Sequence, residues 1–248
     1  MLTVLAISQL AGAVAVAVWV VVAGESFLGA TAATAAMGAG ACGLIGLAAL
    51  YRGMAIGAMG VVAPISSIAA VIPFVYGVAR GERPSALQFV GVVVALAGLA
   101  LVSRTPGGAG GAVAAGVGLA LIAAVGFGLY FVLLGSAADE SAPWAVFVGR
   151  LTSASLALVA VLGARVTLRT GRDLLPAVLA VGLCDVTANV LFALATTRGL
   201  LSVVSVLTSL YPAVTVALAA IVLHERLSRG QLGGAALVLA GAALLTAG

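Results

Sequence analysis

Charged residues are scarce in this 248-residue chain, and lysine is absent altogether. Only 7% of the residues are charged, whereas 64% are hydrophobic and 33 are glycine. No soluble globular domain of this length approaches such a balance. The composition therefore indicates an integral membrane protein that has lipid as its solvent.

Histidine and cysteine are also rare. His224 is the only histidine, and Cys42 and Cys184 lie in apolar runs without a C-x-x-C spacing, so neither a disulfide framework nor a zinc site is indicated. The 11 arginines lie mostly between apolar runs, which is typical of membrane-flanking loops and gives no sign of nucleic-acid binding. We expect no catalytic residues, no metal, no cofactor and no nucleic-acid partner.

Apolar runs long enough to cross a bilayer fill most of the chain. A transmembrane helix needs about 20 apolar residues. Nine such runs are present, at 2–23, 32–51, 59–79, 86–103, 112–134, 143–162, 174–195, 203–223 and 231–247. We predict an all-α integral membrane bundle with nine transmembrane helices.

The two halves of the chain repeat each other. GERPSALQFVGVVVALAGLAL at 81–101 matches HERLSRGQLGGAALVLAGAAL at 224–244, with 10 of 21 positions identical at a constant shift of 143 residues. We predict a first repeat over 1–104, a glycine-rich linker over 105–111 and a second repeat over 112–248. The second repeat has five apolar runs and the first has four, so we expect the first to lack its opening helix. A tandem copy of a five-helix unit inserts upside down, which predicts an inverted repeat.

Each half also contains a characteristic helix before its glutamate-arginine loop. LYRGMAIGAMGVVAPIS at 50–66 precedes GERPSALQFVG, and ATTRGLLSVVSVLTSLYP at 195–212 precedes HERLSRGQ. With these motifs the chain resembles the drug/metabolite transporter (DMT) superfamily, EamA-type, over essentially its whole length. The resemblance implies a ten-helix carrier, here without its first helix, that moves a small metabolite or drug-like molecule by alternating access. We expect it to act as an exporter in the plasma membrane.

Shorter patterns in the sequence bear on energy coupling and on the roles of two glutamates in the loops. The phosphate-binding pattern G-x-x-x-x-G-K-[ST] is missing, so transport would use a proton or ion gradient, or simple facilitation. Glu82 and Glu225 lie beside arginines at helix ends, where we expect them to form solvated loop pairs that fix those ends, with a role in gating as the alternative.

Two ionisable residues lie inside predicted helices. Asp185 is near the middle of 174–195, and Asn189 shares its face one turn later. Because an ionisable side chain at a helix centre in lipid costs roughly 2.5–3.5 kcal/mol on insertion scales, Asp185 is a candidate substrate or proton site. The alternative is an interhelical hydrogen bond that only holds the bundle together. Arg150 needs a partner, and if Asp185 neutralises it, the pair is structural.

The resemblance also suggests that residues with hydroxyl groups line the transport pathway. Ser66, Ser209 and Tyr211 lie in corresponding helices of the two repeats, which in relatives line the central pathway. The alternative is a well-packed helix kinked at Pro64 or Pro212. Tyr130 would suit stacking on a ligand, although a tyrosine near a helix end is more often an interfacial anchor.

Two other functions fit a membrane chain of this kind. A non-transporting subunit or receptor would have a stable partner protein and would show no substrate-dependent change. An intramembrane enzyme would need paired catalytic groups, such as a His/Asp cluster or a Ser/Lys dyad, and His224 lies at a loop.

Overall fold

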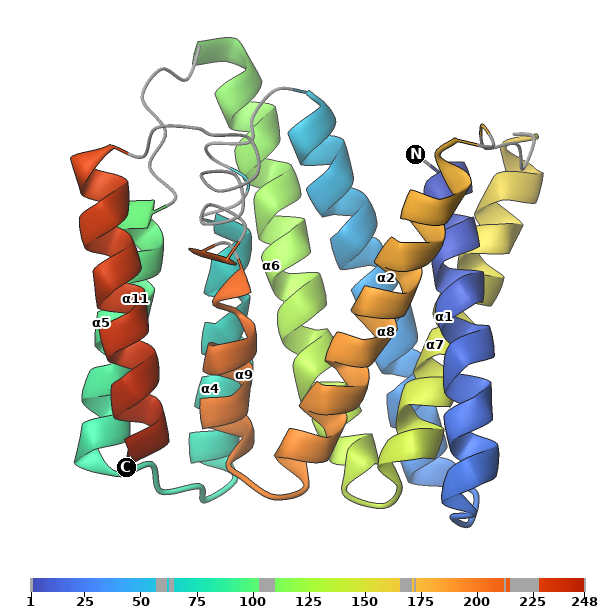
Figure 1. Cartoon of the computed structure of the whole chain (residues 1–248), viewed down its shortest axis with the longest axis horizontal. Coiled ribbons are helices and arrows are strands. Elements are labelled where there is room, and N and C mark those ends of the chain that lie inside the picture. The colour runs from blue at the N-terminus through green and yellow to red at the C-terminus, as the bar shows by residue number, and fades with distance from the viewer. Residues whose placement is uncertain are drawn as a thin grey trace. The chain divides into compact units, whose positions relative to one another are not determined.

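The computed structural model describes residues 2–56, 62, 65–102, 110–165, 171, 173–211, 213–214 and 228–247. These residues form nine α-helices and one 3-10 helix, and none of them forms a β-strand (Figure 1). The helices are α1 (Leu2–Ala23), α2 (Ala30–Ala55), η1 (Ser67–Ala70), α4 (Val71–Ala79), α5 (Ala86–Val102), α6 (Gly110–Ala138), α7 (Ala142–Gly163), α8 (Leu175–Thr196), α9 (Leu201–Thr208) and α11 (Arg229–Ala247).

The α-helices follow the apolar runs of the sequence. Each of the nine predicted runs overlaps one α-helix, so the predicted all-helical membrane bundle is confirmed. Five helices, α1, α2, α6, α7 and α8, are long and apolar enough to cross a membrane, and α4, α5 and α11 contain shorter apolar stretches. Residues 105–109 of the predicted linker lie outside the described residues, and Gly110 and Gly111 begin α6.

Small residues are buried in the helices while many large apolar side chains lie outside. Ala6 and Ala36 are completely buried, whereas Val14 is 70% exposed and Val21 is 80% exposed. This is the pattern expected in lipid, because helices associate there through close packing of small residues and not through burial of large ones. The exposed valines and leucines are therefore positioned to contact acyl chains.

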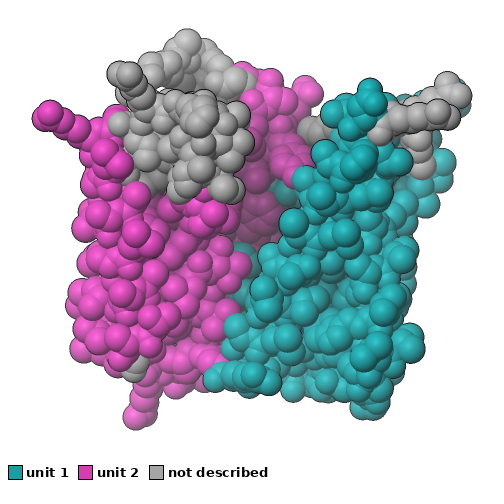
Figure 2. All heavy atoms as spheres, viewed as in Figure 1, with its two compact units in different colours: residues 1–48, 129–198 teal, residues 49–128, 199–248 magenta. Residues whose placement is uncertain are grey.

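The chain divides into two compact units, each with helices from both halves of the sequence (Figure 2). Unit 1 comprises Met1–Ala48 and Leu129–Arg198, and unit 2 comprises Ala49–Gly128 and Gly199–Gly248. The predicted halves 1–104 and 112–248 describe a repeat in sequence and not these units, so the division into repeats stays a prediction.

Unit 1 is held together by close contacts at glycine. α1 packs against α7 and α8. A methyl group on Gly12 of α1 would lie 3.3 Å from the carbonyl oxygen of Gly182 in α8, and one on Gly40 of α2 would collide with the backbone of Gly149 in α7. The absence of a side chain at these positions lets the helix backbones approach.

Two glutamates also form hydrogen bonds between the loops of unit 1. The Glu140 carboxylate accepts a hydrogen bond from the Gly29 amide, at 2.5 Å between Oε1 and N, just before α2. The Glu25 carboxylate accepts one from the Ser141 hydroxyl, at 2.6 Å between Oε2 and Oγ, just before α7. Each carboxylate therefore lies near the start of a helix, where unpaired amides and the helix dipole favour negative charge.

Unit 2 contains two helix pairs. α5 lies beside α11, and α4 lies beside α9 (Figure 1). Phe74 of α4, Leu99 of α5, Val206 of α9 and Leu245 of α11 share one apolar core, which joins the two pairs.

The α5–α11 contact has an internal symmetry. A methyl group on Gly91 would lie 3.0 Å from the carbonyl oxygen of Gly241, and one on Gly98 would lie 2.8 Å from that of Gly234. The sequence shift of 143 residues carries Gly91 to Gly234 and Gly98 to Gly241. The shift therefore converts one contact into the other, as a two-fold axis between α5 and α11 would do.

Candidate functional site

Arg150 is the buried charged residue at the centre of a polar cluster in unit 1. It lies on α7, with only 6% of its surface exposed. Gly12 of α1 leaves room for the arginine, since a methyl group at that position would lie 3.4 Å from Arg150 Cδ. The guanidinium is thus placed among α1, α7 and α8 by the same close helix packing that builds the unit.

Side chains from two other helices meet at this guanidinium. Arg150 Nη1 donates to Gln9 Oε1 on α1 at 2.5 Å and to Asp185 Oδ2 on α8 at 2.6 Å. The Ser153 hydroxyl lies 2.9 Å from the same Gln9 oxygen. The arginine and the aspartate that the sequence suggested as partners therefore form an ion pair, to which Gln9 adds a neutral acceptor.

The two members of the ion pair differ in exposure. The Asp185 side chain is 43% exposed, whereas that of Arg150 is 6% exposed. Arg150 has five N–H donors in all, and the two bonds to Gln9 and Asp185 both come from Nη1. The site thus has a partly exposed carboxylate backed by a buried cation.

Two further predicted residues lie in the same unit. Asn189 is half-buried one turn after Asp185 on α8. Tyr130 of α6 packs over Gly43 of α2, where a methyl group would lie 2.8 Å from Tyr130 Cδ2. The structure thus gathers Tyr130, Arg150, Asp185 and Asn189 in unit 1.

The other predicted residues lie in unit 2. The Ser66 hydroxyl is buried and lies 3.3 Å from the Tyr211 hydroxyl, while Tyr211 is 40% exposed. Ser209 is buried in the turn that ends α9. Pro64 and Pro212, at which a kink was expected, lie outside the described residues.

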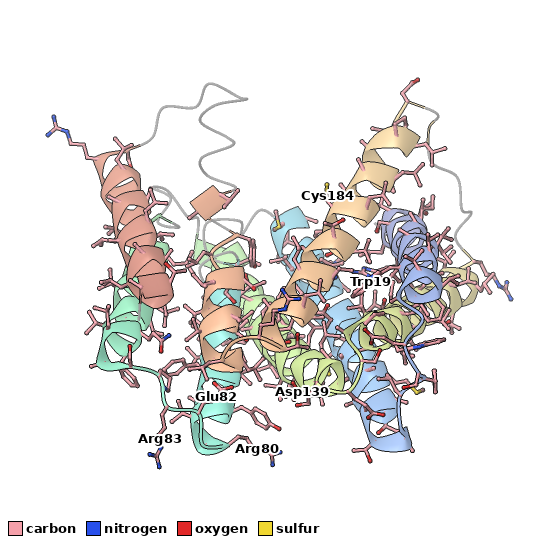
Figure 3. All side chains as sticks on the ribbon, turned by 60° about the horizontal axis from the view of Figure 1, so that its bottom comes forward. Trp19, Arg80, Glu82, Arg83, Asp139 and Cys184 are labelled. Atoms are coloured by element: carbon pink, nitrogen blue, oxygen red, sulfur yellow. The ribbon has the colours of Figure 1, made fainter. Side chains whose placement is uncertain are left out.

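Glu82 binds the start of α9 in unit 2. Its carboxylate accepts hydrogen bonds from the Leu201 amide at 2.9 Å and from the Ser202 amide at 3.0 Å. Arg83 extends away from the helices, whereas the Arg80 guanidinium lies 5.9 Å from the centre of the Tyr76 ring of α4 and Glu82 lies at the start of α9 (Figure 3). The carboxylate therefore binds the start of α9, whereas the sequence suggested a solvated pair that fixes the helix ends flanking its own loop. Glu225 lies outside the described residues.

Some polar residues in these clusters gave no clear signal in the sequence. Ser153 bonds to Gln9, and Ser202 lies against Glu82, yet serine in a membrane helix is common enough to pass as a packing residue. The position of Ser153 could have been predicted from its spacing, because it follows Arg150 by three residues and so lies on the same face of the helix.

Comparisons with known proteins agree with this architecture. The sequence profile of the EamA-like transporter family matches residues 114–247. A crystal structure of another protein is similar over 99% of this chain and 88% of its own, with a TM-score of 0.81 and 18% sequence identity, which supports the fold alone. No match is found among curated proteins. The chain is a multi-pass membrane protein that belongs to the EamA-like transporter family.

Proposed function

We propose that this protein is a secondary transporter that exports a small metabolite or drug-like molecule across the plasma membrane by alternating access. The observation that carries the proposal is the Arg150–Asp185 ion pair within unit 1. Ionisable side chains are expensive in membrane helices and mark substrate or ion pathways there. Asp185, with 43% of its side chain exposed, is the accessible member of the pair.

The ion pair suits a binding site in which Asp185 exchanges Arg150 for another positive partner. In a medium of low dielectric constant the separated charges are costly, so Asp185 releases Arg150 only when another positive group or a proton replaces it. A cationic group of the substrate, or the coupling proton, meets that requirement. Asn189 and Tyr130 supply a neutral amide and a phenol on the same unit for the rest of the ligand.

Alternating access is supported by the contacts between α5 and α11. The 143-residue shift exchanges the Gly91–Gly241 contact with the Gly98–Gly234 contact, as expected for repeats related by a two-fold axis. When such repeats lie inverted in a membrane, exchanging their conformations converts an inward-open state into an outward-open state. A proton or ion gradient would drive the cycle in one direction.

Transport into proteoliposomes tests this function. Purified protein is assayed under an imposed pH gradient with labelled amino acids, sugars, nucleosides and cationic drugs. We expect at least one compound to accumulate, and Asp185→Asn to reduce its rate at least 10-fold. Asp173→Asn, the same change at an exposed loop residue, should leave the rate unaltered.

The outcomes separate the parts of the proposal. If no compound enters faster than in protein-free liposomes, the transporter assignment fails. If Asp185→Asn transports at the wild-type rate, the ion pair is only structural. Accumulation of the same compound in everted, but not right-side-out, cell membrane vesicles would support export.

A further inference from the structure

Gln9 is the second acceptor of the Arg150 guanidinium in unit 1. Its Oε1 atom lies 2.5 Å from Arg150 Nη1, and Asp185 Oδ2 lies 2.6 Å from the same nitrogen. This amino group carries two hydrogens, so it can donate one to each acceptor at the same time. One nitrogen of the guanidinium is therefore held by an amide on α1 and by a carboxylate on α8.

The two acceptors differ in exposure and in chemistry. Gln9 is 4% exposed, whereas the Asp185 side chain is 43% exposed. The surroundings of the protein therefore reach the carboxylate far more than the amide. Because an amide does not titrate, the Gln9 oxygen also stays an acceptor whatever the protonation state of Asp185.

The Gln9 amide is fixed with its oxygen toward the arginine. Arg150 has only N–H donors, so the amide atom that faces it must be the oxygen. The Ser153 hydroxyl of α7 lies 2.9 Å from that oxygen and 2.9 Å from the Arg150 carbonyl oxygen. Ser153 can donate its single proton to either acceptor, and so supports the Gln9 oxygen from the helix that carries the arginine.

Close helix contacts fix the two acceptors on either side of the guanidinium. Gly12 follows Gln9 by three residues on α1, and a methyl group there would lie 3.3 Å from the Gly182 carbonyl oxygen of α8. Gly182 precedes Asp185 by three residues, and a methyl group there would collide with the Ser8 backbone. The backbones of α1 and α8 therefore touch beside the cluster, which leaves Gln9 little freedom to move away from the arginine.

These contacts give Gln9 its largest effect when Asp185 is neutral. A buried cation that loses its counter-ion is costly, because its charge is no longer compensated. Hydrogen bonds to a charged group are roughly twice as strong as those between neutral groups, so the remaining bond to Gln9 offsets part of this cost. The guanidinium then has a reason to stay beside α1.

We propose that Gln9 is a positioning residue that retains the Arg150 guanidinium whenever Asp185 is neutralised or takes another partner. The retained arginine stays in place to pair with Asp185 again. The part that Gln9 plays in transport rests on the proposed exchange at Asp185, whereas the retention itself can be measured without a substrate.

Melting temperatures of a double-mutant cycle test the retention in the purified full chain. Asp185→Asn replaces the carboxylate with a neutral group of the same shape, and so reproduces the neutral state of Asp185. Gln9→Leu removes the amide acceptor. The effects of two substitutions add when the residues act independently, and they depart from additivity when the residues share a partner.

We expect Gln9→Leu to lower the melting temperature more in the Asp185→Asn background than in wild type, by about 3 °C or more. Ser8→Ala is the matched control, because Ser8 is a buried neighbour of Gln9 whose hydroxyl donates to the Leu5 carbonyl of its own helix at 3.0 Å. The control should have the same effect in both backgrounds. An equal effect of Gln9→Leu in both backgrounds would overturn the proposal.

Moving the charge gives a second reading, which also holds if the Gln9→Leu/Asp185→Asn variant does not fold. We expect Gln9→Glu/Asp185→Asn to melt at a higher temperature than Asp185→Asn alone, because the new carboxylate would pair with Arg150. A lower melting temperature would show that Arg150 does not stay beside α1 when Asp185 is neutral, and would contradict the proposal. Neither measurement uses transport, so a protein with this coupling that carries no compound would contradict the transporter assignment alone.

Discussion

At the residue scale, the Arg150–Asp185 pair combines a buried cation with a partly exposed anion. Gln9 and Ser153 surround the arginine, but neither carries a charge that could replace the aspartate. The arginine therefore depends on Asp185 for neutrality more than Asp185 depends on the arginine.

This asymmetry predicts which substitution harms stability more. Asp185→Leu leaves the Arg150 charge buried and unpaired, so we expect it to lower the free energy of unfolding by about 3 kcal/mol. Arg150→Met leaves a carboxylate that is 43% exposed and can still be hydrated, so its cost should be smaller, about 1 kcal/mol.

Thermal unfolding of both single variants and of the double variant measures this difference. The double variant should recover most of the loss, since it leaves no unpaired charge. A larger loss for Arg150→Met than for Asp185→Leu would show that the arginine is held by its other contacts and not by charge pairing.

The charged residues of the site could be predicted from the sequence because charge is rare and costly within apolar runs. Asp185 and Arg150 stood out for that reason. Ser153, Ser202 and Ser205 did not, because hydroxyl side chains are common in membrane helices and their role depends on which neighbour they face. Their hydrogen-bonding state follows from helix packing, which one sequence does not specify.

At the element scale, glycines set how closely α5 and α11 approach. Gly98→Ala places a methyl group 2.7 Å from the Val238 backbone nitrogen and 2.8 Å from the Gly234 oxygen. Backbone atoms cannot move away cheaply, so we expect a loss of about 1–3 kcal/mol.

A glycine in open space provides the matched control. Among the described residues, nothing beyond the adjoining turns of α6 lies within 4 Å of a methyl group added at Gly118, so Gly118→Ala should be neutral or should stabilise the helix. Melting temperatures that change alike in Gly98→Ala and Gly118→Ala would argue against the close α5–α11 contact.

Glu82 is predicted to stabilise the start of α9. Glu82→Ala removes the acceptor of the Leu201 and Ser202 amides, which should lower the free energy of unfolding by about 1 kcal/mol, as for other helix caps. Arg83→Ala removes a neighbouring charge that extends away from the helices and should have little effect (Figure 3). Equal melting temperatures for wild type and Glu82→Ala would exclude the cap.

The lengths of the apolar runs predicted the helices well, because a bilayer fixes how many residues a span needs. Breaks within a run were harder to predict. The 59–79 run contains η1 followed by α4, and α9 begins at Leu201, two residues before its predicted run. A continuous apolar run does not distinguish a 3-10 turn from an α-helix, because it has no polar positions that would reveal the number of residues per turn.

At the scale of the whole molecule, the repeat and the compact units divide the chain differently. Unit 1 combines α1 and α2 with α7 and α8, so each unit draws on both sequence halves. The repeat could be read from identities at a shift of 143 residues, but identity between segments does not say which helices pack together. That depends on small residues such as Gly12 and Gly182, which resemble the chain's many other glycines in sequence.

The most direct test of the Arg150–Asp185 site as a ligand site is thermal stabilisation of the purified protein by candidate ligands. Wild type, Asp185→Asn and Asp173→Asn are each heated with amino acids, sugars, nucleosides and cationic drugs. A ligand at 100 times its Kd stabilises the folded state by about 2.7 kcal/mol, enough to raise the melting temperature by several degrees. We predict that at least one compound stabilises wild type and Asp173→Asn but has a much smaller effect on Asp185→Asn; equal stabilisation of all three proteins, or of none, would contradict the account.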